Sequence, residues 1–390
     1  MPRVWRTALG LALGPAVVLG LARFAYGLLL PSMRSDLGWS FARAGTINAA
    51  NAGGYLAGAL IAAPVCARVG PRQAFMGGMI VTSAAVLASG ASGLFGYLLV
   101  LRVIAGVAGA VTFIAGAALT AGIARDGNAG TLLCVYVAGG GLGIALSGIF
   151  VPVLLDRLSW RVGWVALGGL SMIGAGLAEP AARRARTPPP RIAAEVPRWN
   201  GRPISAVLLS YFCFGGGYIA YVTFIVAFLR HEGAGTGEIS AFWCVLGLTG
   251  LFAAFGWGRV MDKLGGGRSV ALATGTVTVG AFLPLISGAA PMAFLSAVVF
   301  GGSFLAVPAA VTSFARRHHE PHHWTIAISA LTVGFAFGQC LGPVMAGVLS
   351  DGPSGIRAGL TLSVAILAAG AVFAVAQPRL QDVAAPTLPV

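Results

Sequence analysis

Long apolar stretches alternate with short polar segments along almost the whole chain. Twelve of these stretches are long enough to cross a bilayer, because a spanning helix needs about 20 mostly apolar residues. They fall at residues 8–33, 44–66, 73–92, 95–122, 129–153, 160–178, 204–229, 238–261, 269–288, 291–315, 324–349 and 356–376. The pattern predicts an all-α membrane protein with twelve transmembrane helices.

The polar interruption at residues 179–203 contains three consecutive prolines and six arginines, and we expect an extended cytoplasmic linker there. It would separate two six-helix bundles, at residues 1–178 and 204–390. A shift of 195 residues supports this division, because it superimposes equivalent positions of the two bundles without gaps. The matched positions are Ala25-Tyr26 with Ala220-Tyr221, Arg68 with Lys263, Gly70 with Gly265, Gly106 with Gly301, Gly139 with Gly334, and Gly143 with Gly338. Two such repeats are one way to build a transporter.

Charge is scarce and unevenly distributed. Only 9% of the 390 residues are charged, against roughly a quarter in soluble proteins, so much of the surface must face lipid. The net charge of +14 does not indicate a nucleic-acid partner, because the basic residues lie between apolar stretches, where they set membrane orientation. With a cytoplasmic N-terminus, 17 basic residues lie inside, six outside and two within helices. We therefore expect a cell inner-membrane protein with both termini cytoplasmic, and a monomer.

A short loop motif occurs twice, between the second and third helices of each half. The second copy, residues 258–265, reads GRVMDKLG and includes Asp262 and Lys263. The first copy, at residues 63–72, has Ala67 where the pattern has an acid, and it keeps Arg68, Gly70 and Arg72. We expect conformational roles for Arg68, Asp262 and Lys263, since a carboxylate at a loop can cap a neighbouring helix and stabilise one conformer.

Two further motifs complete a resemblance to a known family. Arg102 is followed by small residues in the fourth helix, and the fifth and eleventh helices are rich in glycine. Together with the loop motif, these features resemble the major facilitator superfamily, and residues 23–40 look like its YbfB/YjiJ-type branch. The resemblance implies the major facilitator fold, in which the first and fourth helices line a central cavity.

The glycines of the fifth and eleventh helices lie on one face of each helix, at i, i+4 spacing. They are Gly139 and Gly143, and Gly334 and Gly338. Small residues let helices approach closely in lipid, where apolar contact alone drives little association. Two compatible interpretations are static packing, and gating by sliding against helices of the opposite half.

Arg23 and Arg102 are the most informative residues, because an arginine in mid-membrane costs several kcal/mol unless it is paired or faces a wet cavity. Helical rise places both at similar depth. We expect both to face a positively charged cleft in the central cavity. Alternatively, backbone carbonyls or helix ends hold each side chain. Either side chain locked wholly within the N-terminal bundle would remove the basis for an anion-selective carrier.

The eleven acidic residues all fall in loops or at helix ends, so the buried arginines have no mid-membrane counter-charge. This argues for an anionic substrate and against an acid-based proton relay, although protons can still travel with the substrate. Glu238, at the start of the eighth helix, is the acid best placed for a relay. Further expected substrate contacts, for which packing is the alternative, are Tyr26, Asn51, Tyr218, Tyr221 and Gln339.

These observations favour a secondary transporter that moves a small organic anion or carboxylate-bearing solute by alternating access, with possible proton coupling. The alternatives are a drug/proton-antiport exporter and, from another class, a non-transporting membrane sensor. No catalytic motif such as HExxH is present, so we expect neither an enzyme nor a cofactor. His318, His319, His322 and His323 lie beside two arginines, which favours a solvated loop over a metal site.

Overall fold

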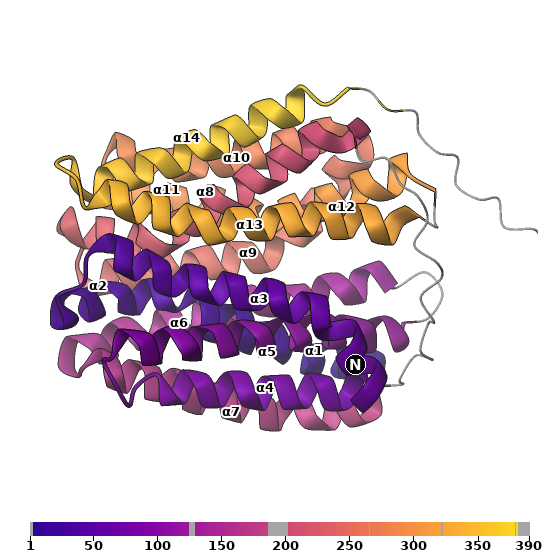
Figure 1. The fold of residues 1–390 in the computed structure, drawn as a ribbon, viewed down its shortest axis with the longest axis horizontal. Helices are drawn as coiled ribbons and strands as arrows, with labels where there is room; N and C mark the ends of the chain where they lie inside the picture. Colours follow the sequence, from indigo (N-terminus) through magenta and orange to yellow (C-terminus); the bar gives the residue numbers. More distant parts are fainter. Residues whose placement is uncertain are drawn as a thin grey trace, which may run out of the picture.

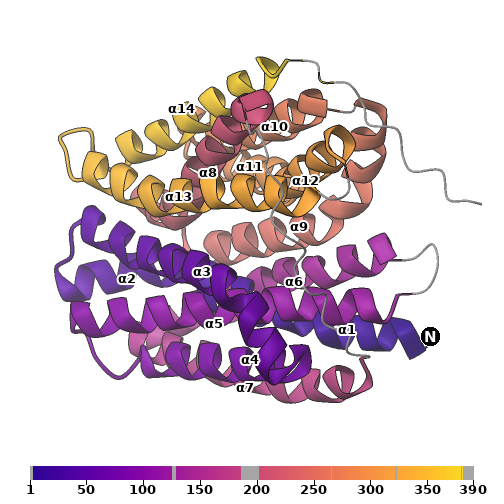
Figure 2. The same ribbon diagram turned by 45° about the vertical axis from the view of Figure 1, so that its right-hand side comes forward.

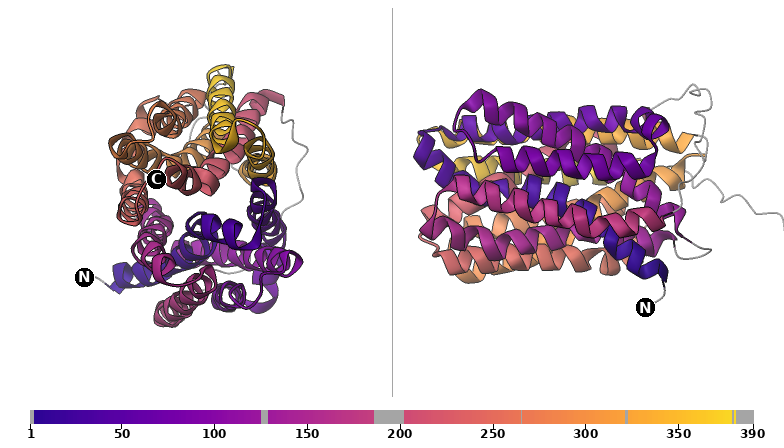
Figure 3. Two further views of the ribbon diagram at one scale, coloured as in Figure 1. Left: turned by 90° about the vertical axis from the view of Figure 1, so that its left-hand side faces the viewer. Right: turned by 90° about the horizontal axis from the view of Figure 1, so that it is seen from below.

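The computed structural model describes residues 3–124, 129–185, 202–264, 266–320, 323–378 and 380, and within these ranges the chain is helical with short connections. The helices run along one common direction and form two layers, one from each half of the chain (Figure 1). Seen along the helices, the layers are two separate groups of helix ends (Figure 3). The predicted all-α fold of two pseudo-symmetric six-helix bundles is confirmed.

The N-terminal half forms the lower layer of Figure 1. Its first membrane span is continuous but consists of three segments, α1, η1 and α2. The elements are α1 (Arg3–Pro15), η1 (Ala16–Phe24), α2 (Tyr26–Leu37), α3 (Phe41–Val69), α4 (Pro71–Ala88), α5 (Phe95–Gly122), α6 (Ala129–Arg157) and α7 (Trp160–Arg184).

The C-terminal half forms the upper layer and repeats this plan, with one span divided at Leu305 into α11 and α12. The elements are η2 (Arg202–Ile204), α8 (Ser205–His231), α9 (Thr236–Leu264), α10 (Gly266–Ile286), α11 (Ala290–Phe304), α12 (Ala306–His318), α13 (Trp324–Ser350) and α14 (Gly355–Val375).

Eleven spans among the described residues are long and apolar enough to cross a membrane, and α4, with 18 residues, completes the set of twelve. Most predicted boundaries agree with the helices to within a few residues. The sixth span is the main difference, since α7 continues to Arg184 and takes up the first part of the predicted linker. Glu179, at the start of that linker, pairs with Arg72 at 3.4 Å and also contacts Arg183.

The start of α1 and the end of α14 lie at the same end of the bundle, here called the termini-side end, and the opposite end is the distal end (Figure 1). The two halves meet along two helix pairs, α3 with α13 and α6 with α9, and also where α2 meets α8. Figure 2 shows α3 beside α13, and α6 beside α9. Close approaches at Gly45–Pro343 and Gly148–Cys244 lie in the distal parts of these pairs.

Two aspartates join the halves at the distal end. Asp351, just after α13, accepts hydrogen bonds from the backbone N–H groups of Phe41 (2.7 Å) and Ala42 (2.9 Å), which begin α3. Asp156, near the end of α6, accepts from the Thr236 hydroxyl (2.6 Å), which begins α9. The 195-residue offset relates Asp156 to Asp351 and Phe41 to Thr236, so equivalent aspartates contact equivalent helix starts in the opposite half. We call this pair of cross-half contacts the distal latches.

Candidate site between the two halves

The first span changes its winding near its middle. The π-helical segment η1 begins directly after Pro15, which has no N–H to donate, and its last bond runs from the N–H of Ala25 to the carbonyl of Gly20 (3.1 Å). A π-helical turn holds one residue more than an α-helical turn and often marks a functional site. Arg23 lies in this final turn.

The repeat shows where the extra residue was accommodated. A β-carbon added at Gly143 would overlap the carbonyl oxygen of Ala16, and one added at Gly338 would overlap that of Phe212. Gly143 and Gly338 differ by 195 positions, but their partners differ by 196. After η1, Ala25-Tyr26 again matches Ala220-Tyr221 at 195. The first helix of the N-terminal half therefore contains one residue more than its counterpart α8. This additional residue lies within η1, close to Arg23.

This change of phase directs Arg23 toward the other half. Its Nη2 donates to the side-chain oxygen of Gln339 on α13 (2.7 Å), and the Gln339 amide nitrogen donates to the Tyr218 hydroxyl on α8 (2.6 Å). The guanidinium also lies 5.2 Å from the ring centre of Tyr55 on α3. All three predicted residues, Arg23, Tyr218 and Gln339, are buried and meet where the halves join.

Arg102 has different surroundings, and the expectation that both arginines face the space between the halves is wrong for it. Its Nη1 donates to the carbonyl oxygen of Ala22 (2.7 Å), and its guanidinium lies 4.6 Å from the ring centre of Trp164. Its side chain is 2% exposed, and these partners all belong to the N-terminal half. The alternative interpretation, an arginine held by a backbone carbonyl, fits this geometry. The basis in two arginines for an anion-selective carrier is thereby removed, and any argument for an anion depends on Arg23 alone.

Three other predicted substrate contacts also lie within single halves. Tyr26 donates to the carbonyl of Ala44 (2.8 Å), and the amide nitrogen of Asn51 donates to that of Arg102 (3.0 Å). The Tyr221 hydroxyl lies 2.5 Å from that of Ser296 on α11. In this conformation the three side chains serve interhelical hydrogen bonding, which was their alternative interpretation.

The four i, i+4 glycines pack within their own halves in this structure. Gly139 and Gly143 face α1 and η1, whereas Gly334 and Gly338 face α8. These four glycines therefore make no close approach to the opposite half in this structure, and their predicted sliding against it stays a prediction. Other glycines occupy the cross-half surface: a β-carbon added at Gly141 would lie 2.6 Å from the carbonyl oxygen of Gly247 on α9.

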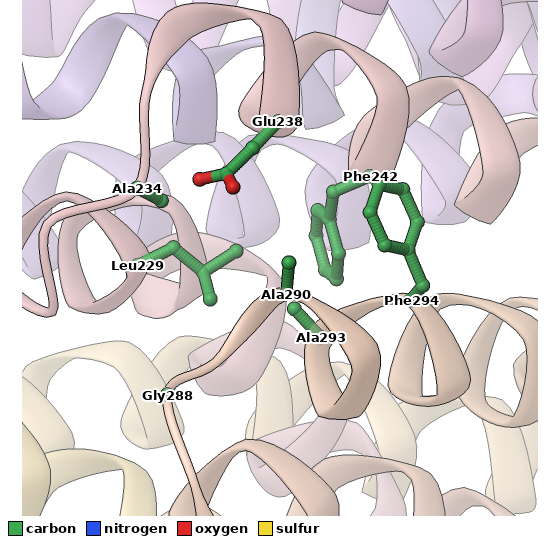
Figure 4. Close-up of a pocket in the computed structure, with 8 residues that line it drawn as sticks. All are labelled: Leu229, Ala234, Glu238, Phe242, Gly288, Ala290, Ala293 and Phe294. Carbon is green, nitrogen blue, oxygen red and sulfur yellow. The ribbon is translucent and has the colours of Figure 1, made fainter.

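The predicted loop residues lie at the termini-side end, away from Arg23. Arg68 and Lys263 are exposed, and the side chain of Asp262 is outside the described residues. Glu238 is also remote, since it begins α9 at the distal end and lines a cavity of about 10 Å³, roughly room for one water (Figure 4). Its carboxylate accepts from the N–H of Gly235 (3.0 Å), which is a helix-capping contact rather than part of a relay to Arg23.

The charge of Arg23 has no ionic partner within the described part of the chain, and its Nε has no hydrogen-bond acceptor there. Its hydrogen-bond acceptor is a neutral amide. A second polar contact between the halves, from the Asn48 amide to the Thr223 hydroxyl (2.5 Å), is neutral as well. The interface therefore has an unneutralised positive charge, which an incoming anion can neutralise.

Sequence reasoning missed the aromatic surroundings of Arg23. Phe304 and Phe335, from α11 and α13, both stack on Tyr218, with ring centres 6.3 and 5.8 Å from it. Phenylalanine is common in lipid-facing positions, so the sequence carries no signal that separates these two from the others.

Comparisons with known proteins agree with this architecture. A family model described as "Uncharacterised MFS-type transporter YbfB" matches residues 15–375. A bacterial homolog of the human lysosomal transporter Spinster, in an inward-facing and occupied conformation, superimposes with a TM-score of 0.79 at 16% identity, covering 99% of this chain and 100% of that one. Its unoccupied form gives 0.76 at 15% identity, with 97% of each chain covered. A mutant of the nucleoside transporter NupG gives 0.74 at 13%, covering 95% and 98%.

Proposed function

The chain belongs to the family of YbfB-type MFS transporters, and from this premise we propose that it is a secondary carrier for a small organic anion bearing a carboxylate. Such a carrier binds its solute between the two halves and exposes the site to each side of the membrane in turn. Arg23 provides the positive charge, and Gln339 and Tyr218 complete the polar part of the site.

One observation carries the proposal. Arg23 is buried where the halves meet, and within the described residues it has a neutral acceptor and no counter-ion. A buried cation is costly unless a charge or water compensates it. An anion that binds to Arg23 would remove this cost, and the free energy released would favour its binding. The planar guanidinium also matches the two oxygens of a carboxylate.

Orientation and conformation are part of the same proposal. The excess of basic residues supports a cytoplasmic location for the termini-side end and a periplasmic one for the distal end. The distal latches close the two halves together at the outer end, which supports an inward-facing form. A substrate would then enter or leave the Arg23 site from the cytoplasmic side.

Uptake into proteoliposomes from a panel of radiolabelled carboxylates, with and without a pH gradient, tests this function. The Arg23→Gln variant should lose uptake by 10-fold or more, while Arg23→Lys keeps a part of it, because lysine retains the charge without the fork of donors. Arg357→Gln is the matched control, since Arg357 is exposed at the distal end and contacts the carbonyl of Leu285.

Normal carboxylate uptake by Arg23→Gln would refute the proposed site. The drug/proton-antiport alternative would be favoured if liposomes containing the wild-type protein take up no carboxylate but expel a cationic dye when a pH gradient is imposed. A pH gradient that drives carboxylate uptake would assign the coupling to the proton.

A further inference from the structure

Aromatic rings of the C-terminal half lie beside Gln339, the hydrogen-bond partner of Arg23: Tyr218 accepts from Gln339, and Phe335 precedes it by four residues on α13. Phe335 is the centre of the group: its ring is nearly parallel to those of Tyr211, Tyr218 and Phe214, with interplanar angles of 12°, 6° and 13°. The ring centres of Phe335 and Tyr211 are 4.5 Å apart. Parallel rings of this kind form a surface that favours another flat ring over a puckered one.

The N-terminal half contributes rings as well. Tyr55 lies beneath the guanidinium of Arg23, and Phe24, the residue after Arg23, meets Phe304 edge to face at 6.1 Å. Tyr55 and Phe24 of the N-terminal half therefore lie next to Arg23, and Tyr218 of the C-terminal half is joined to it through Gln339. A ligand whose charge is bound by Arg23 would have Tyr55 on the side of the N-terminal half and Tyr218 on the side of the C-terminal half.

Two of these rings, Tyr55 and Phe335, are half-buried, whereas the others are buried. They belong to α3 and α13, the helix pair that joins the halves. A β-carbon added at Gly53 on α3 would lie 3.8 Å from the sulfur of Cys340 on α13. Tyr55 and Phe335 both lie on the termini-side of this contact, one in each half.

We propose that the carrier selects a flat aromatic ring bearing one carboxylate. This inference rests on the proposed function and specifies its substrate class. The carboxylate takes the place of the Gln339 oxygen on Arg23, and the ring packs against Phe335 and Tyr55. Since Arg102 is held within the N-terminal half, the site offers one positive charge, which matches a monocarboxylate and leaves the second charge of a dicarboxylate unpaired.

Competition binding to the full chain in lipid nanodiscs tests this inference, with radiolabelled benzoate as the probe. Cyclohexanecarboxylate has the same charge but a puckered ring, phthalate adds a second carboxylate, and benzamide removes the charge. Benzoate should compete about 2- to 10-fold better than cyclohexanecarboxylate, the advantage expected of an aromatic pair. Phthalate and benzamide should compete at least 10-fold more weakly.

The Phe335→Leu variant should bring benzoate and cyclohexanecarboxylate to equal affinity. Phe337→Leu, on the same helix but 53% exposed, should keep the difference. Equal affinity of the two acids for the wild-type protein would overturn the aromatic selection and leave an anion carrier standing. Failure of both acids to bind would refute this substrate class, whereas failure of the whole carboxylate panel in the liposome assay would refute the proposed function itself. Strong binding of benzamide would refute the role of the charge.

Discussion

Removal of the distal latches should open the distal end of the carrier. Asp351 caps two backbone N–H groups at the start of α3, and loss of such a cap costs about 0.5–2 kcal/mol. Asp156 makes a more exposed contact with Thr236 and lies 3.8 Å from Arg230, which is worth about 0.2–1 kcal/mol. Because the two contacts are on different helix pairs, their effects should add to about 1–3 kcal/mol. That corresponds to about a 5- to 150-fold shift toward the form open at the distal end.

Spin labels can measure this shift without knowledge of the substrate. Ala91, in the loop between α4 and α5, and Ala289, just before α11, are exposed at the distal ends of the two halves. Labelled cysteines at these positions, in a background in which the five native cysteines are replaced, report the distance between the halves. The Asp156→Ala/Asp351→Ala protein should gain a population at longer distance, and each single variant should show a smaller gain.

Asp36→Ala is the matched control. Asp36 is another acid at the distal end, but it accepts from the indole N–H of Trp160 (2.7 Å), and both residues belong to the N-terminal half. Its loss should leave the distance distribution unchanged. The reasoning fails if the double alanine variant has the distribution of the wild type, or if Asp36→Ala opens the distal end to the same extent.

Further predictions concern packing, the buried arginine and the π-helical segment. Gly143→Ala should destabilise the protein by about 1–3 kcal/mol in thermal unfolding, since its β-carbon overlaps backbone, whereas Gly169→Ala, with open space around it, should be neutral. Arg102→Met should keep anion binding within about 3-fold. It should not lower the thermal stability, because an apolar group replaces a buried charge that has no counter-ion. Loss of binding in a stable protein would contradict this. Deletion of Ala22 should abolish anion binding, since one residue rotates the helix by about 100° and turns Arg23 away from its partner; binding by the deleted protein would show that the π-helical turn is dispensable.

The helices and their pairing into halves were predictable because hydropathy is a local property. A run of apolar residues needs no knowledge of its neighbours to be assigned to the membrane, and the boundaries of α5 agree with the predicted 95–122. The repeat was readable for the same reason, since the same residues recur at one offset. Even the depth of Arg23 and Arg102 follows from counting, and the two arginines do approach a common region around Ala22.

The direction of each side chain around its helix was not predictable. Arg23 and Arg102 look alike in sequence, but one faces α13 and the other Trp164, and a difference of about 100° per residue decides between them. The π-helical turn in η1 adds one residue to the first span. An ideal α-helix through the whole span would therefore give the wrong side-chain directions either before or after this turn. The aromatic group depends on several helices at once, and no local pattern contains it.

The two halves are also chemically unlike near η1, at a point where their repeat would otherwise make them mirror each other. At the 195-residue offset, the position of Arg23 in one half is occupied by Tyr218 in the other. A ligand at this position therefore meets a cationic pole on one side and an aromatic, amide-bearing pole on the other. Under the proposed function, an anionic ligand would therefore bind in a single preferred orientation, with its carboxylate toward the N-terminal half.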